Sequence, residues 1–121
     1  MKESFIDVSP NIQLYCQVHD FTDPWLEVPT IIMVHGFAES SLSWYAWIPY
    51  LARHFRVILF DMRGYGKSTP MPIDFTWTMD CLLNDISHVA KHFSLTKFHL
   101  IGAKSGGSLV LQYAAKYPES I

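Results

Sequence analysis

The chain has 121 residues, a formal net charge of −2 and 50% hydrophobic residues. Its length suits a single domain, and its apolar content supports a packed core and excludes an intrinsically disordered chain. The nine Lys and Arg residues are scattered, which excludes a nucleic-acid-binding stripe, and no apolar run approaches the roughly 20 residues that span a membrane.

The N-terminal third of the chain predicts a β-hairpin, a loop and a buried strand. Two segments, residues 5–9 and 12–18, flank a Pro-Asn turn and predict the hairpin. Residues 21–29 carry two prolines and are predicted to form a loop. Residues 30–36, TIIMVHG, form a short apolar run that ends in glycine, which is typical of a buried strand.

Beyond this strand, helical and strand patterns alternate. Apolar residues have near-helical spacing over residues 41–55, although Pro49 argues against one continuous helix. The remaining elements are predicted, in chain order, as a strand at 56–62, a loop at 63–75, a helix at 78–93, a strand at 97–103 and a helix at 105–120 that ends near Pro118.

This alternation of strand and helix predicts an α/β fold. The strands after residue 29 lack polar alternation, as expected for a mostly parallel sheet with helices on both faces, preceded here by the antiparallel hairpin. Ligands of such sheets bind beyond the carboxyl ends of the strands. Three loops follow strands in this way, and we expect the functional site among them: HGFAES at 35–40, DMRGYGKS at 61–68 and GAKSGG at 102–107.

Nucleotide and metal sites are not predicted. A P-loop would need glycine at Asp61, five residues before Gly66, and a dinucleotide fingerprint would need glycine at Thr69. Cys16 and Cys81 have neither metal-binding nor redox spacing and suggest buried thiols in a reducing compartment. We therefore expect a cytoplasmic protein with no cofactor and no metal site.

Together the three loops resemble motifs of the α/β-hydrolase superfamily. VHGFAESSLSW is similar to the family's H-G-x loop, whose backbone N–H groups help build the oxyanion hole, and FDMRGYGKS is similar to its D-x-R-G-x-G-x-S loop. LIGAKSGGSLVLQYAAKYPE resembles the nucleophile elbow with its helix. The resemblance covers essentially the whole chain. It implies a cofactor-free hydrolase of esters, lactones or C–C bonds, with an apolar or carbonyl-containing small molecule as substrate.

The same resemblance implies that part of the catalytic machinery lies elsewhere. The family's triad follows the order nucleophile, acid, histidine, with the last two on later strands. All six histidines of this chain precede the elbow, and none matches the catalytic position. We therefore expect residues 1–121 to be the N-terminal half of a single domain, truncated after the elbow helix and inactive alone. The strand at 97–103 would then be an unpaired apolar edge. The alternative is a non-catalytic protein of the same fold that binds a small ligand or a protein partner.

The elbow pattern G-x-S-x-G fits GAKSGG in two registers. One register places Lys104 at the nucleophile position between Gly102 and Gly106, with Gly107 allowing close helix packing; the other places Ser105 there, between Ala103 and Gly107. The spacing from the elbow to the helix-ending YPE favours Lys104. The oxyanion donors would be the N–H groups of Phe37 and Ser105 in the first register, and those of Phe37 and Gly106 in the second.

A lysine at the elbow allows different chemistries. Burial and the helix dipole would favour its neutral amine and a Schiff base with a carbonyl substrate. An acyl-lysine would be an amide that water does not release readily, so Lys104 is alternatively an anion-binding group or the mark of a lost nucleophile. Ser105 would act conventionally with the distant histidine, or is only a polar residue of the first helical turn.

Further side chains support these loops. His35 and Gly36 match the oxyanion loop in a structural role, and Asp61 and Arg63 are expected to brace the elbow by ion pairing and hydrogen bonds. Asp80 and Asp85 are expected on the surface of the preceding helix. Glu39 is expected as a solvated loop residue or helix cap. Among the aromatic residues Phe37, Trp44, Trp47 and Trp77, Phe37 is expected to face the site and the others to pack in the core.

Overall fold

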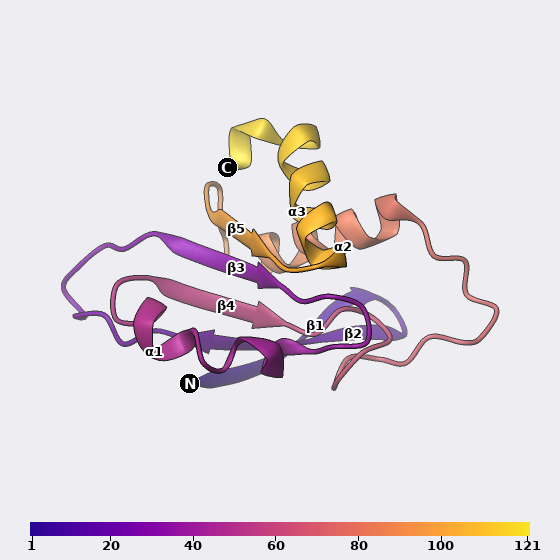
Figure 1. Cartoon of the computed structure of the whole chain (residues 1–121), viewed down its shortest axis with the longest axis horizontal. Coiled ribbons are helices and arrows are strands. Elements are labelled where there is room, and N and C mark those ends of the chain that lie inside the picture. The colour runs from indigo at the N-terminus through magenta and orange to yellow at the C-terminus, as the bar shows by residue number, and fades with distance from the viewer.

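A five-stranded sheet forms the centre of the structure, a computed structural model that describes residues 1–121 (Figure 1). The order across the sheet is β1-β2-β4-β3-β5. β1 pairs antiparallel with β2 and β2 antiparallel with β4, whereas β3 runs parallel to β4 and β5. The strands are β1 (Lys2–Ser9), β2 (Ile12–His19), β3 (Thr30–Val34), β4 (Arg56–Phe60) and β5 (His99–Gly102). The predicted α/β sheet with an antiparallel N-terminal hairpin is confirmed.

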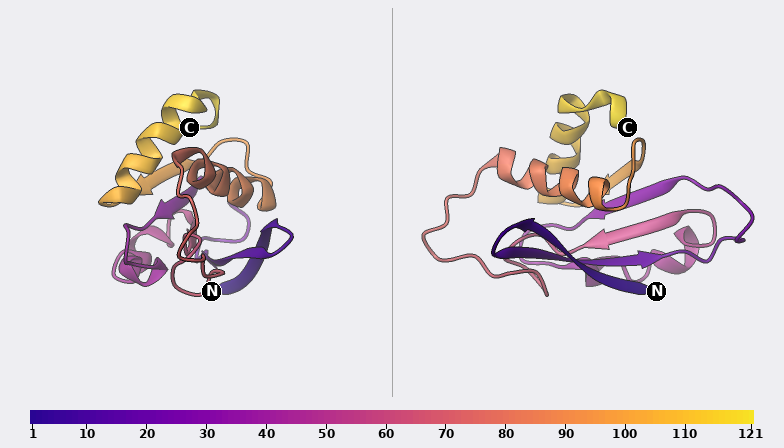
Figure 2. Two further views of the ribbon diagram at one scale, coloured as in Figure 1. Left: turned by 90° about the vertical axis from the view of Figure 1, so that its right-hand side faces the viewer. Right: turned by 180° about the vertical axis from the view of Figure 1, so that it is seen from behind.

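Helices cover both faces of the sheet, as predicted. Helices α2 (Met79–His92) and α3 (Ser105–Lys116) lie on one face, and α1 (Ile48–Leu51) lies on the other (Figures 1 and 2). Two short 3₁₀ turns, η1 (Ser41–Trp44) and η2 (Pro118–Ser120), precede α1 and follow α3. No helix combines the length and the apolar character that crossing a bilayer requires.

The all-apolar strands are explained by this two-sided packing. Alternate side chains of a strand point to opposite faces, so Ile32 and Val34 of β3 join the core under α2 and α3. Ile31 and Met33 join a second, smaller core against η1 and α1. Every residue of β3 is therefore buried.

The segment 41–55 forms two short helical pieces instead of one helix. Pro49 is the second residue of α1, and proline has no N–H to donate to the carbonyl four residues earlier. A helix that begins at Ser41 therefore cannot continue through Pro49, and a new one begins at Ile48. Trp44 and Ile48 are buried, so the near-helical spacing identified only part of the buried surface of this segment.

Helix α2 begins and ends where the sequence predicted. The Thr78 side chain caps its N-terminus by accepting a hydrogen bond from Cys81 N–H at 3.2 Å, and Phe93 follows its last residue. The expectation that Asp85 lies on the surface is wrong, because only 2% of this residue is exposed. It lies on the buried side of α2 with Leu82 and Ile86, where Arg63 neutralises its charge.

Strand β5 is an outer strand of the sheet. It pairs with β3 on one side and has no strand on the other, as expected for the apolar segment 97–103. In Figure 1 it lies next to α3, and the chain turns sharply between the two elements. The carboxyl ends of β3, β4 and β5 all reach the same edge of the sheet, shown at the right in Figure 1.

Candidate active site

The three loops singled out from the sequence meet at that edge. Met62 N–H, which follows β4, donates a hydrogen bond to His35 Nε2 after β3 at 2.9 Å. Phe37 N–H donates to Ser105 Oγ at 2.7 Å and so joins the loop after β3 to the start of α3. The loop after β4 is thus held by a side chain of the loop after β3, which is itself held by the Ser105 side chain at the start of α3.

His35 is completely buried and has a bracing position. Its Nε2 accepts the Met62 N–H, so the ring proton is on Nδ1, which lies 2.7 Å from the Gly36 carbonyl oxygen and donates to it. Both ring nitrogens are therefore used inside the loops. This arrangement supports the structural role expected for His35.

Asp61 is a buried carboxylate that ties two loops together. Its Oδ1 accepts Ser41 N–H at 2.7 Å and its Oδ2 accepts Lys67 N–H at 2.9 Å. The Asp61 carbonyl oxygen accepts the Ser68 hydroxyl at 2.6 Å. With 2% of the residue exposed, Asp61 is satisfied by backbone donors and presents no free oxygen to a substrate.

Arg63 braces the same loop against helix α2. Its Nε and Nη2 donate to the two carboxylate oxygens of Asp85, both at 2.8 Å, and its guanidinium lies 5.6 Å from the ring centroid of Phe75. The hydrogen bonds to Asp85 raise the pKa of Arg63 and so favour its charged form. Arg63 therefore has a structural partner, although this partner is on α2 and not in the turn before α3.

The turn between β5 and α3 has a strained residue at its centre. Lys104 has φ 56° and ψ −125°, a conformation that residues with a side chain rarely adopt. Gly102 and Gly106 make this sharp turn possible. A Cβ atom on Gly102 would overlap the Gly106 carbonyl, and one on Gly106 would overlap the carbonyl groups of Val34 and His35. Close helix packing was expected of Gly107, but Gly106 provides it.

The Lys104 side chain forms an ion pair with Glu39. Its Nζ lies 3.0 Å from Glu39 Oε1, and the Ser43 hydroxyl donates to Glu39 Oε2 at 2.8 Å. The hydrogen bond from Lys104, followed by that from Ser43, lowers the pKa of Glu39. The Lys104 side chain is 75% exposed, so the burial expected of it is absent.

The three N–H groups considered as oxyanion donors differ in their availability. Gly106 N–H donates to the Ala103 carbonyl at 2.9 Å, and Phe37 N–H donates to Ser105 Oγ. Ser105 is the first residue of α3, where an N–H has no acceptor within the helix. Of the three, Ser105 N–H is the one that helix geometry leaves free, and the Ser105 hydroxyl oxygen already accepts a hydrogen bond.

Aromatic side chains extend from this turn toward the start of α2. The Phe37 ring stacks on Tyr65 at 6.1 Å between centroids, and Tyr65 contacts Trp77 at 6.3 Å. Phe37 is 51% exposed and Trp77 45%. Trp44 is buried in the core as expected, whereas Trp47 and Trp77 are not. The exposed rings of Phe37 and Trp77 give the site an apolar border.

Comparison with known proteins decides the family. A family model described as the alpha/beta hydrolase fold matches residues 29–121, which include all three loops. The chain belongs to the α/β-hydrolase family. Among solved structures, a hydrolase from Pseudomonas aeruginosa superposes with a TM-score of 0.87 at 27% identity, over 99% of this chain and 43% of that chain.

Curated relatives of this α/β-hydrolase-family chain include hydrolases. Epoxide hydrolase 4 of Mus musculus is 33% identical over 77% of this chain and 26% of its own length. The putative carbamate hydrolase RutD of Agrobacterium fabrum is 32% identical over 89% of this chain and 40% of its own length. The chain thus spans between about a quarter and two fifths of the length of these relatives.

Sequence reasoning missed two partners within this α/β-hydrolase fold. Asp85 was assigned to the surface, although its position beside Leu82 and Ile86 in an apolar stripe was a signal for a buried polar group. Glu39 was expected as a solvated loop residue or helix cap, and no sequence signal indicated that it pairs with Lys104. No group of three or more His, Cys, Asp or Glu side chains is arranged to hold a metal ion.

Proposed function

We propose that this chain forms the first half of a hydrolase site for small carbonyl-containing molecules, such as esters, lactones or substrates cleaved at a C–C bond. In this proposal Lys104 holds the position that the nucleophile holds in α/β-hydrolases, and the acid and histidine of the triad lie in a later segment of the same domain. The family membership and the hydrolase relatives support the reaction class.

The observation that carries the proposal is the strained turn at Lys104 with its ion pair to Glu39. A lysine held by a carboxylate is an ammonium group, which is not a nucleophile. We infer that Lys104 acts as a fixed cation that stabilises negative charge on a carbonyl oxygen or on a leaving group. Such charge stabilisation needs no acyl-lysine, which would be an amide too stable to turn over.

The backbone supports the same position for the reacting carbonyl. Ser105 N–H is free of a helical acceptor and lies one residue after Lys104, so it is suited to donate to an oxyanion. Phe37 N–H would become a second donor once the Ser105 hydroxyl rotates away from it. Ser105 itself is a poor candidate nucleophile here, because its oxygen is held by the loop after β3 and because Gly106 N–H is used by Ala103.

Two variants and two chemical probes test the proposal on the full-length protein, with ester, lactone and β-diketone substrates. Lys104→Met is expected to lower kcat/KM by about 10²-fold, the size found when an oxyanion donor is removed. Ser105→Ala is expected to keep most of the activity. Labelling of Ser105 by a fluorophosphonate probe, found by peptide mass spectrometry, would overturn the role given to Lys104. A borohydride-trapped adduct on Lys104 with a carbonyl substrate would show covalent catalysis instead of a fixed cation.

A binding protein without catalysis is the second candidate. It is favoured because Phe37 N–H, an expected oxyanion donor, already donates its hydrogen bond to the Ser105 hydroxyl oxygen. In that case no substrate class is turned over, although small carboxylates bind and Lys104→Met weakens their binding. Turnover by wild type that is lost in Lys104→Met would reject this candidate.

A further inference from the structure

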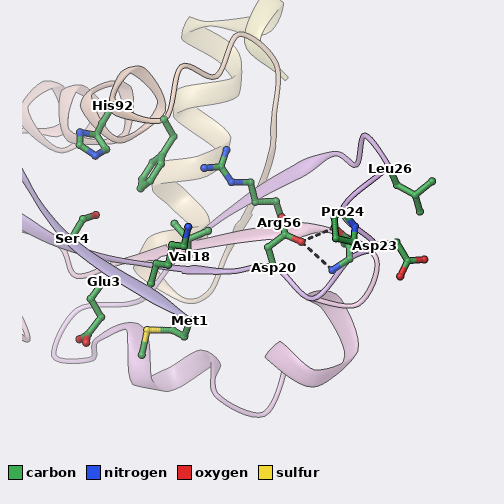
Figure 3. A pocket seen from close by; sticks show the side chains of 13 residues that line it. Met1, Glu3, Ser4, Val18, Asp20, Asp23, Pro24, Leu26, Arg56 and His92 are labelled. Carbon is green, nitrogen blue, oxygen red and sulfur yellow. Dashed lines mark hydrogen bonds between the residues drawn. The ribbon is translucent and has the colours of Figure 1, made fainter.

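A cavity of about 650 Å³ opens at the end of the sheet opposite the candidate active site (Figure 3). It lies beside Arg56, the first residue of β4, whereas the candidate active site follows the last residue of that strand. Its walls come from the start of β1, the end of β2 with the loop after it, and the end of α2. Its volume is in the range of about 300–1,000 Å³ that small-molecule sites occupy.

Arg56 is a cation without an anionic partner in this cavity. The five ion pairs of the chain do not include it, so no carboxylate oxygen lies within 4.0 Å of its guanidinium. The guanidinium is instead 5.4 Å from the ring centroid of Phe93. Figure 3 shows the side chain extending toward the end of α2, on the side where His92 lies. A half-buried guanidinium with an aromatic ring on one side keeps its fork of N–H donors available.

The carboxylates that line the cavity are engaged by other groups. Asp20 accepts the backbone N–H and the hydroxyl of Thr22, at 3.0 and 2.6 Å, as the dashed lines in Figure 3 show. Asp23 pairs with Arg53 at 3.5 Å, and Glu3 pairs with Lys67 at 3.8 Å. Asp23 and Glu3 thus have cationic partners and Asp20 has neutral hydrogen-bond donors, whereas Arg56 has no anionic partner.

The remaining wall of the cavity offers apolar surface. Val18, Pro24, Leu26 and Phe93 line it, and Leu26 is 54% exposed. A ligand with only a charged head would leave this surface in water, whereas a ligand with an apolar body would cover it. The cavity therefore combines the guanidinium fork of Arg56 with an apolar wall, and Lys2 is a second cation in its lining.

We propose that this cavity is a second binding site, for a small organic carboxylate with an aromatic or aliphatic body. The carboxylate pairs with the guanidinium fork of Arg56, since planar bidentate pairing is the geometry that arginine offers to carboxylates. The apolar body lies against Val18, Leu26 and Phe93. The site is separate from Lys104 and does not depend on the proposed hydrolase function.

The probe is 3-phenylpropanoate, with the neutral 3-phenylpropanamide as its match in size. Binding is followed by the backbone amide NMR signals of isotope-labelled full-length protein. The acid is expected to shift the signals of Val18, Leu26 and Phe93, and the amide to bind at least about tenfold more weakly, because hydrogen bonds to a charged group are the stronger ones. Arg56→Gln is expected to weaken binding of the acid by a similar factor of about tenfold.

Two further variants keep the outcome decisive. Arg53→Gln removes an exposed guanidinium at the same end of the sheet, 3.5 Å from Asp23, and is expected to leave the affinity within about twofold of wild type. Arg56→Lys keeps the charge but not the fork and is expected to bind the acid with intermediate affinity. This variant decides the test if Arg56→Gln does not fold. The proposal is overturned if the acid shifts no signals at the cavity, if it shifts only those around Lys104, or if Arg53→Gln and Arg56→Gln weaken binding equally.

Discussion

The buried ion pair between Arg63 and Asp85 is expected to be a main stabiliser of the loop after β4. Their side chains are 9% and 3% exposed, and two hydrogen bonds of 2.8 Å join them. Asp85→Asn keeps the shape of the side chain but leaves the Arg63 charge buried without a counter-charge. Removal of one partner of a buried pair costs about 3–5 kcal/mol. We expect about 3 kcal/mol here, because the asparagine oxygen still accepts one hydrogen bond.

The same helix supplies a matched control. Asp80 pairs with Lys116 at 3.5 Å, with side chains 80% and 45% exposed, and a surface pair of this kind is worth about 0–1 kcal/mol. The free energies of unfolding of wild type, Asp80→Asn and Asp85→Asn are measured by urea denaturation of the full-length protein. Equal effects of the two substitutions would refute the argument from burial.

A double substitution separates the charge from the packing. Arg63→Met combined with Asp85→Leu removes both charges and keeps apolar volume, and replacing a complete buried pair in this way is often neutral. The double variant is therefore expected to recover most of the stability lost in Asp85→Asn. A double variant no more stable than Asp85→Asn would show that the site needs the pair for its geometry and not only for charge balance.

Two further predictions follow from shifted pKa values. The Glu39 pKa is lowered below 4.5 chiefly by Lys104, so Lys104→Met should raise it more than Ser43→Ala does, as measured by NMR titration of the carboxyl carbon. Because the folded-state pKa is the lower one, stabilisation by this pair is complete above pH about 4.5 and is lost as the pH falls through the folded-state value. Burial raises the pKa of Cys16 to about 12. Iodoacetamide at mildly alkaline pH should therefore alkylate the half-buried Cys81 before Cys16, as measured by peptide mass spectrometry. Earlier alkylation of Cys16 would contradict this.

The order of the elements could be predicted from the sequence because it depends on local patterns. The all-apolar runs before His35 and before Asp61 form buried parallel strands, and the period of residues 78–93 gives α2 within one residue at each end. Placing the three loops at one edge then needed only the rule that parallel strands end together. Pro49 correctly indicated that residues 41–55 do not form one continuous helix. The break is larger than expected, since the segment forms two short pieces.

The side-chain partners within the site could not be predicted in the same way. The pairs Arg63–Asp85 and Lys104–Glu39 join residues 22 and 65 positions apart in the sequence, so no periodicity connects them. The hydrogen bond from Phe37 N–H to the Ser105 hydroxyl depends on the rotamer of a single side chain. Such contacts are set by the relative positions of loops on different strands, which local patterns do not determine.

The backbone of the turn and the side chain at its centre have separate causes. The turn at Lys104 depends on Gly102 and Gly106, where side chains would collide with carbonyl groups, and on the start of α3. A strained non-glycine residue costs on the order of 1–3 kcal/mol and persists where the surrounding structure leaves no alternative. These constraints act on the backbone and are satisfied with lysine at the centre. Recognising the fold from GAKSGG therefore does not identify the chemistry. The chemistry depends on what the side chain of residue 104 contacts, and here it contacts the carboxylate of Glu39.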